Sequence, residues 1–180
     1  MNYILKVFQV ILTPEVGWKR LGELYIPSGL LARELFYPLL AVLSLTSFVG
    51  MLYGNGGGLS QHLVLAISQF ASYMLTLLLG LYVLGMVIGP TGTTEHMERA
   101  ENYLVCLLTY LAMLSIIKNL LPTPFAPMYL LDLYVGLLAY KGASYVMGEN
   151  ESKGKVWITA TVLALLLPWG ICQILGLIVK

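Results

Sequence analysis

The stretch SQHLVLAISQFASYMLTLLLGLYVLGMVI, residues 60–88, decides the fold class of this chain. It contains no Lys, Arg, Asp or Glu, and it exceeds the roughly 20 apolar residues that a helix needs to cross a bilayer. Backbone groups inside lipid must be hydrogen-bonded within the segment, so a stretch of this kind forms a helix. We therefore expect a membrane-spanning helix that tilts or extends beyond the hydrocarbon core.

The composition of the whole chain supports the same class. Of the 180 residues, 58% are hydrophobic and 11% are charged, whereas a soluble domain carries about 25% charged residues. The mean hydropathy is +0.82 and the formal net charge is +1. These values exclude a water-soluble globule, a disordered chain and a nucleic-acid binder. Cys106 and Cys172 lie in apolar runs and are expected to be buried thiols, which excludes a disulfide scaffold.

Four further apolar stretches flank residues 60–88 and are separated from it and from one another by glycine-rich, proline-containing or polar connections. Residues 1–32 precede the first of them and are expected to form a cytoplasmic interfacial helical segment. The predicted fold is therefore all-α: a polytopic membrane protein with an N-terminal amphipathic segment and five transmembrane helices, at residues 33–53, 60–88, 103–121, 127–147 and 156–179.

The N-terminal segment contains a helix-start pattern, Thr13-Pro14-Glu15, followed by Trp18, Lys19 and Arg20. An indole beside two cations favours the membrane–water interface, where one side is apolar and the other is hydrated. Ordinary packing of this helix against the ends of the spans is an equally good interpretation.

The basic residues predict the orientation of the spans. One side carries eight of them and the other carries two, Lys118 and Lys180. Cytoplasmic loops are enriched in Lys and Arg, so we expect a cytoplasmic N-terminus, an outside C-terminus and a location in a prokaryotic cytoplasmic membrane. The eight residues on the cytoplasmic side are Lys6, Lys19, Arg20, Arg33, Arg99, Lys141, Lys153 and Lys155.

Asp132, in PMYLLDLYVGLLAY, is the carboxylate that lies within a predicted span. A charged side chain at that depth costs about 2.5–3.5 kcal/mol on insertion scales, so it normally faces a partner, the bundle interior or water. The cations nearest in depth are Lys118 and His62. One interpretation is a proton- or cation-coupled site. The other, which we favour, is a buried ion pair or hydrogen-bonded carboxyl group that holds two helices together.

Small residues recur every four positions in residues 60–88, namely Ser68, Ser72, Thr76 and Gly80, and Gly85 and Gly89 form a GxxxG pattern. Small side chains at this spacing let helix backbones approach closely in lipid. The pattern fits a helix–helix contact in a homodimer, but we favour helix packing within one chain.

No catalytic or metal site is expected. The histidines, His62 and His96, fall on opposite sides of the predicted membrane and cannot share a metal. The carboxylates near His96 are better explained as solvated residues that compensate the dipole at a helix N-terminus than as metal ligands. No Ser-His-Asp, Cys-His or paired-carboxylate arrangement emerges, so we expect neither catalytic residues nor a cofactor.

The layout resembles the Yip-domain family, named for interaction with Ypt/Rab GTPases, and is more similar to its prokaryotic branch. The resemblance lies in the order of segments along nearly the whole chain, which is TPEVGWKRL at 13–21, YPLLAVLSL at 37–45, GPTGTTEHMERAENYLV at 89–105, LLDLYVGLLAYKGASYVM at 130–147 and a last proline-bearing span. It implies a small helical membrane protein concerned with membrane organisation or trafficking. The DLYGP-like motif of eukaryotic members is absent, so Rab-GTPase binding is not implied.

The leading functional hypothesis is a non-enzymatic membrane scaffold that acts through helix packing and partner binding. Its partners would be the lipid bilayer and either further copies of the chain or other membrane proteins, with no nucleic acid and no known small-molecule substrate. The alternative is a small oligomeric transporter or channel subunit that uses Asp132.

Overall fold

The computed structural model describes residues 2–24, 26–53, 58–89, 93–122, 127–148 and 153–178. The described residues form helices and their connections, with no strand among them, which confirms the all-α prediction for this part of the chain. Parts of the predicted connections, residues 54–57, 90–92, 123–126 and 149–152, and the predicted end of the last span at 179, lie outside the described residues. The elements in order are α1 (Asn2–Leu12), α2 (Pro14–Gly22), η1 (Ala32–Phe36), α3 (Tyr37–Thr46), α4 (Val49–Leu52), α5 (Leu59–Ile88), α6 (Thr94–Leu120), α7 (Pro127–Met147) and α8 (Lys153–Ile178).

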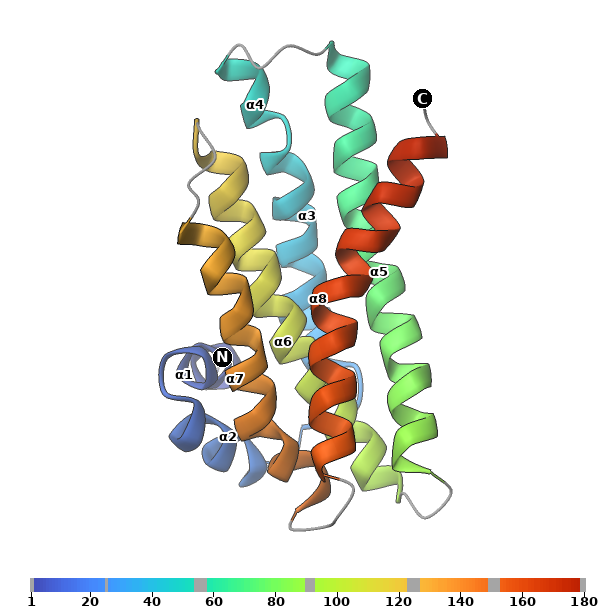
Figure 1. Cartoon of the computed structure of the whole chain (residues 1–180). Coiled ribbons are helices and arrows are strands. Elements are labelled where there is room, and N and C mark those ends of the chain that lie inside the picture. Colours follow the sequence, from blue (N-terminus) through green and yellow to red (C-terminus); the bar gives the residue numbers. More distant parts are fainter. Residues whose placement is uncertain are drawn as a thin grey trace.

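The long helices form an up-and-down bundle (Figure 1). The segment η1–α3–α4 runs up, and α5, α6, α7 and α8 then alternate in direction. The short helices α1 and α2 lie beside the lower half of the bundle, next to α7, and the C-terminus lies at the upper end.

Four helical segments among the described residues are long and apolar enough to cross a membrane: Ala32–Leu52, Leu59–Ile88, Thr94–Leu120 and Lys153–Leu175. They indicate a membrane protein. The helix α7 has the bounds predicted for the fourth span. It is more polar than the apolar parts of these four segments, since it contains Asp132, Lys141 and several tyrosines.

The helices α2, α6 and α8 pack against α7 and contact its backbone with aromatic side chains. Trp18 of α2, Tyr103 and Tyr110 of α6 and Trp157 of α8 all donate hydrogen bonds of 2.7–3.1 Å to backbone carbonyls of α7. These hydrogen bonds hold α7 against α2, α6 and α8.

The first predicted span is helical but not a regular α-helix. It begins with a π-turn at Ala32–Phe36 and is interrupted at Ser47 before α4. Pro38 has no N–H for the carbonyl of Glu34, and a wider turn before a proline accommodates this missing hydrogen bond.

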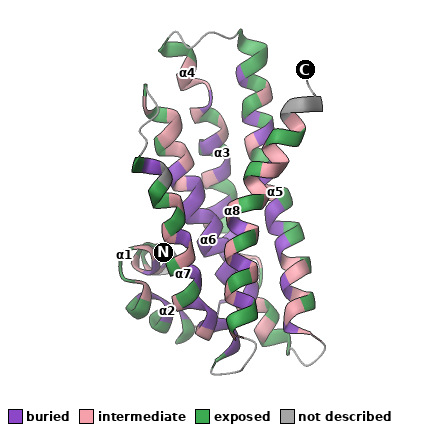
Figure 2. Cartoon of the chain, in the orientation of Figure 1, coloured by how far each residue is buried: buried purple, intermediate pink, exposed green. Residues whose placement is uncertain are grey.

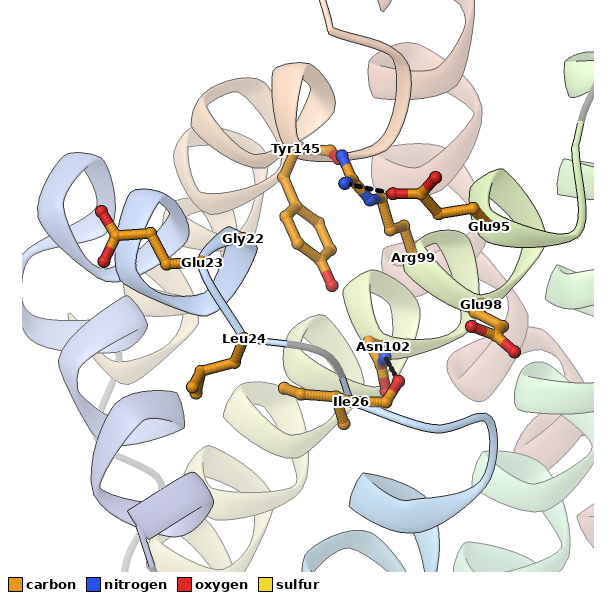
Figure 3. A pocket seen from close by; sticks show the side chains of 9 residues that line it. All are labelled: Gly22, Glu23, Leu24, Ile26, Glu95, Glu98, Arg99, Asn102 and Tyr145. Atoms are coloured by element: carbon orange, nitrogen blue, oxygen red, sulfur yellow. Dashed lines mark hydrogen bonds and ion pairs between the residues drawn. The ribbon is translucent and has the colours of Figure 1, made fainter.

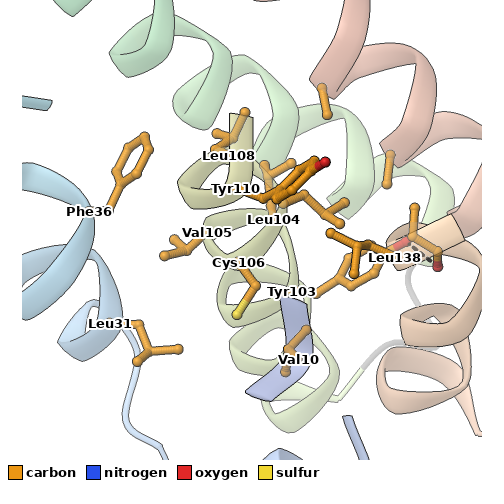
Figure 4. Close-up of a cluster of buried hydrophobic side chains, with 14 of the residues drawn as sticks. Val10, Leu31, Phe36, Tyr103, Leu104, Val105, Cys106, Leu108, Tyr110 and Leu138 are labelled. Carbon is orange, nitrogen blue, oxygen red and sulfur yellow. Dashed lines mark hydrogen bonds between the residues drawn. The ribbon is translucent and has the colours of Figure 1, made fainter. Parts of the chain in front are cut away.

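The helix α6 is the centre of the bundle. Every residue from 102 to 112 is buried, and in Figure 2 the buried positions lie on α6 and on the inward sides of its neighbours. Figure 4 shows Val105 pointing toward Phe36 and Tyr103 toward Leu138, on opposite sides of α6. A helix that is buried all round reads as uniformly apolar, which explains the sequence YLVCLLTYLA at 103–112.

The small residues of α5 pack within the chain. Ser68, Ser72, Thr76 and Gly80 are all buried, and a Cβ at Gly80 would lie 2.6 Å from Leu104 Cδ2. The structure therefore supports intrachain packing of this stripe over a homodimer seam. The assignment of Gly89 to helix packing was wrong. Gly89 has φ +75° and ends α5 as its C-cap, a left-handed conformation that favours glycine.

Candidate functional site

An ion pair joins the upper ends of α6 and α7. Lys118, in the last turn of α6, lies with its Nζ 2.5 Å from Oδ2 of Asp132, in the second turn of α7. Each side chain is about a quarter exposed. The predicted partnership between Asp132 and Lys118 is therefore confirmed.

The ion pair lines an open cavity of about 400 Å³ that four helices border. Its wall combines the two charges with hydroxyl, amide, aromatic and aliphatic groups. The lining residues are Gln69, Ser72 and Tyr73 of α5, Leu111, Ser115 and Lys118 of α6, Asp132 of α7, and Ala164, Leu165, Pro168, Trp169 and Cys172 of α8.

Hydrogen bonds fix the polar groups of this wall. The hydroxyls of Tyr73 and Ser115 lie 2.9 Å apart. Gln69 Oε1 accepts hydrogen bonds from Ser47 Oγ at 2.7 Å and from Asn119 Nδ2 at 3.1 Å. The network connects α5 and α6 with the end of α3, and it holds the cavity wall in one arrangement before any ligand enters.

A proline interrupts the hydrogen bonding of α8 beside the cavity. Pro168 lies inside the helix and has no N–H, so the carbonyl of Ala164 has no donor from the residue four positions on. Both residues line the cavity, and Trp169 beside them is 66% exposed.

The structure does not place His62 near Asp132, so the expectation that His62 is a candidate partner was wrong. His62 is in the first turn of α5 and is buried against the end of α3, where its Nδ1 lies 2.9 Å from the carbonyl of Ser47. His96 is at the start of α6, where it forms a capping box with Thr93. Among the described residues there is no group of three His, Cys, Asp or Glu that could hold a metal ion.

The N-terminal hairpin, residues 2–24 with α1 and α2, is attached to the bundle through Trp18. The indole is 3% exposed and its Nε1 donates to the carbonyl of Leu138 at 3.1 Å. Its ring centroid lies 5.4 Å from those of Tyr103 and Tyr145. Of the two interpretations of Trp18, the structure supports packing against a span, whereas Lys19 and Arg20 are exposed.

Gly142 leaves the space that the Trp18 ring occupies. A Cβ at this position would lie 2.6 Å from Trp18 Cε2 and 2.7 Å from Tyr103 Cε2. Both rings are buried, so neither can move aside freely. We expect Gly142→Ala to lower the free energy of unfolding by about 1–2 kcal/mol, through overpacking.

The matched control for this prediction is Gly170→Ala in α8, where an added Cβ meets nothing within 4 Å. Alanine in an open helical position stabilises by roughly 0.5–1 kcal/mol over glycine. Unfolding in mixed micelles with increasing dodecyl sulfate, followed by circular dichroism, measures both variants. Equal behaviour of the two would contradict the steric argument.

A second contact between the hairpin and α7 is the ion pair of Glu15 and Lys141. The hydrogen bond from the Lys141 ammonium holds the pKa of Glu15 below its ordinary value, and the positive charge adds to this effect. Lys141 therefore pairs with the hairpin and not with Asp132 on its own helix.

We expect the attachment of the hairpin to weaken at acid pH. A carboxylate with a lowered pKa stabilises the folded state above its unfolded pKa of about 4.3, and this contribution disappears as the pH falls through the lowered folded value. Glu15→Gln should remove that part of the pH dependence, whereas Glu34→Gln should keep it. Proteolysis of residues 2–24 between neutral and acid pH measures the effect, which is small because the pair is exposed.

The helix α1 has three distinct sides. Val7 and Val10 are buried against the bundle, and Leu5, Phe8 and Leu12 are exposed on the outer side at helical spacing. Gln9 lies on a polar edge, where its Oε1 accepts a hydrogen bond of 3.0 Å from Arg20 Nη1. We call Leu5, Phe8 and Leu12 the outer stripe.

A smaller cavity of about 160 Å³ lies between the end of α2 and the start of α6 (Figure 3). Arg99 pairs with Glu95 at 2.5 Å, and Asn102 Nδ2 donates to the carbonyl of Ile26 at 3.2 Å. Glu101 accepts hydrogen bonds from Ser28 and from the Gly29 N–H. These contacts fix the connection between the hairpin and the first span to α6.

Sequence reasoning missed residues of the charged cavity and of the contact between the hairpin and α7. Tyr73, Ser115 and Pro168 were read only as parts of spans, and Glu15 only as a helix-start residue. A signal existed for the cavity: Lys118 and Asn119 are adjacent polar residues in an apolar helix, and their side chains pair with Asp132 and Gln69.

Comparisons of the chain with protein-family models, curated proteins and solved structures found no match in any of the three.

Proposed function

We propose that this chain is a non-enzymatic integral membrane protein of the Yip-domain type, which organises the surrounding membrane through its N-terminal hairpin. In this proposal α7 also crosses the membrane and brings the number of spans to five, the hairpin lies at the cytoplasmic leaflet of a prokaryotic cytoplasmic membrane, and the C-terminus is outside. The enrichment of basic residues on the hairpin side supports this orientation.

The outer stripe of α1 is the observation that carries the proposal. Leu5 and Leu12 are 70% and 77% exposed although α1 is held to the bundle by its other side. An amphipathic helix with an apolar side and nearby Lys and Arg residues inserts at the boundary of headgroups and acyl chains. Lys19 and Arg20 on the adjoining helix α2 are exposed and supply the attraction to anionic lipids.

The position of the hairpin explains how insertion would change membrane shape. The hairpin lies beside only the lower half of the bundle (Figure 1), so it widens the protein in one leaflet and not in the other. The Trp18 contact fixes it there, so the added width is transmitted to the lipid as a wedge. Association with further copies or with other membrane proteins would increase the effect.

The test replaces the outer stripe in reconstituted vesicles. We expect wild-type protein to yield narrower vesicles than the variant Leu5→Ala, Phe8→Ala, Leu12→Ala at the same protein-to-lipid ratio, with diameters measured by electron cryomicroscopy. The matched control replaces three exposed leucines of α7, Leu130, Leu133 and Leu137, by alanine. The proposal fails if the stripe variant retains the wild-type diameter.

A second candidate function, a small oligomeric transporter or channel subunit, is favoured by the charged cavity between α5, α6, α7 and α8. One chain has few spanning helices for a complete transport pathway, so in this candidate function several copies of the chain would form the pathway together. Proton flux into reconstituted vesicles should then depend on Asp132, and absence of flux with Asp132 intact would count against it.

A further inference from the structure

The cavity bordered by α5, α6, α7 and α8 presents two opposite charges side by side. Lys118 Nζ and Asp132 Oδ2 are 2.5 Å apart and both residues line its wall. A ligand with a single charge would be attracted by one group and repelled by the other. A zwitterion of matching dimensions is attracted by both, and it brings no net charge into an apolar surrounding.

The acceptors of the wall favour a primary ammonium as the positive group of that zwitterion. Asp132 contributes a carboxylate, and Tyr73 and Ser115 contribute hydroxyls. A primary ammonium donates three hydrogen bonds, whereas a quaternary ammonium donates none. The wall therefore distinguishes an amine from a choline.

The mouth of the cavity favours a ligand that arrives from the lipid. Trp169 is 66% exposed and lines the cavity, and Leu166 on the same part of α8 is 59% exposed. These apolar side chains face outward on a helix that is apolar enough to span a membrane. Acyl chains can lie along this surface while a headgroup enters the cavity, and the Lys118 ammonium then binds the phosphate as a point charge.

We propose that this cavity binds a zwitterionic phosphodiester with a primary amine, the phosphoethanolamine headgroup, supplied by a phospholipid or by the water-soluble diester glycerophosphoethanolamine. The volume of about 400 Å³ lies within the range of about 300–1,000 Å³ that is usual for small-ligand sites. This inference depends on neither function proposed above, because a bound headgroup need not be moved or alter membrane shape.

The experiment measures ligand-induced thermal stabilisation of the full chain in detergent. The probes are dihexanoyl phosphatidylethanolamine, dihexanoyl phosphatidylcholine and soluble glycerophosphoethanolamine. We expect the ethanolamine lipid to raise the melting temperature and the choline lipid to raise it much less. A rise with soluble glycerophosphoethanolamine as well identifies the free diester as a sufficient ligand, and a rise with the lipid alone identifies the lipid as the source. Equal binding of both lipids, or binding of none of the three probes, overturns the proposal.

Two variants separate loss of binding from loss of folding. The double variant Asp132→Leu with Lys118→Met leaves no lone charge and should bind the ethanolamine lipid roughly tenfold or more weakly. Tyr73→Phe removes one hydroxyl without altering the ion pair and should weaken binding by a smaller factor. The matched control, Glu15→Gln with Lys141→Gln, removes an ion pair outside the cavity and should bind as the wild type does. Unchanged binding in the cavity double variant overturns the proposal.

Discussion

Trp18→Ala is expected to lower the free energy of unfolding by about 3–5 kcal/mol, the range for truncating a large buried aromatic side chain. The indole is 3% exposed, contacts Tyr103 and Tyr145, and donates to the carbonyl of Leu138. Its removal leaves a cavity beside Gly142, where no Cβ can fill the space. The attachment of the hairpin would then depend on its remaining buried residues, Val7, Val10 and Leu21, and on the exposed pair of Glu15 and Lys141, which contributes little.

Two measurements check this expectation. Unfolding in mixed micelles gives the free energy, and limited proteolysis of residues 2–24 reports whether the hairpin has left α7. Trp169→Ala is the matched control because the same atoms are removed from a side chain that is 66% exposed. If Trp18→Ala and Trp169→Ala lower stability equally, Trp18 is not the anchor of the hairpin.

Apolar length and turn residues were sufficient to predict the helices, because lipid permits few other backbone structures. The predicted bounds 127–147 coincide with those of α7, and 60–88 differs from α5 at one end by a single residue. The pairing of Asp132 with Lys118 was also predictable, since an intramembrane carboxylate needs a partner and few cations share its depth.

The faces of the helices were less predictable. In a soluble helix the apolar side marks the core, but in lipid both the buried and the exposed sides are apolar, so the sequence does not separate them. Trp18 illustrates this: its neighbours Lys19 and Arg20 favoured an interfacial position, whereas the space that accepts the indole is created by Gly142, far along the chain. Likewise, the burial of His62 depends on the turn after α3, which periodicity cannot place.

Asp132→Leu is expected to destabilise the bundle by about 2–3 kcal/mol, because it leaves the Lys118 ammonium without its carboxylate in a partly buried position. The quarter exposure of both side chains and the location of Lys118 in the last turn of α6 keep the cost below that of a fully buried lone charge. Asp132→Asn should cost less, since the amide retains polar contacts with the wall.

The double variant Asp132→Leu with Lys118→Met should recover most of the stability lost in Asp132→Leu. Replacing both members of a buried ion pair by apolar side chains of similar volume is often neutral or stabilising, since neither charge then has to be desolvated. The difference between the double variant and the sum of the single variants gives the coupling energy of the pair. A double variant as unstable as the sum of its parts would mean that the two residues stabilise the bundle independently. Recovery would instead show that the fold does not need the pair for stability, which is the result expected if the two charges serve to bind the ligand proposed above.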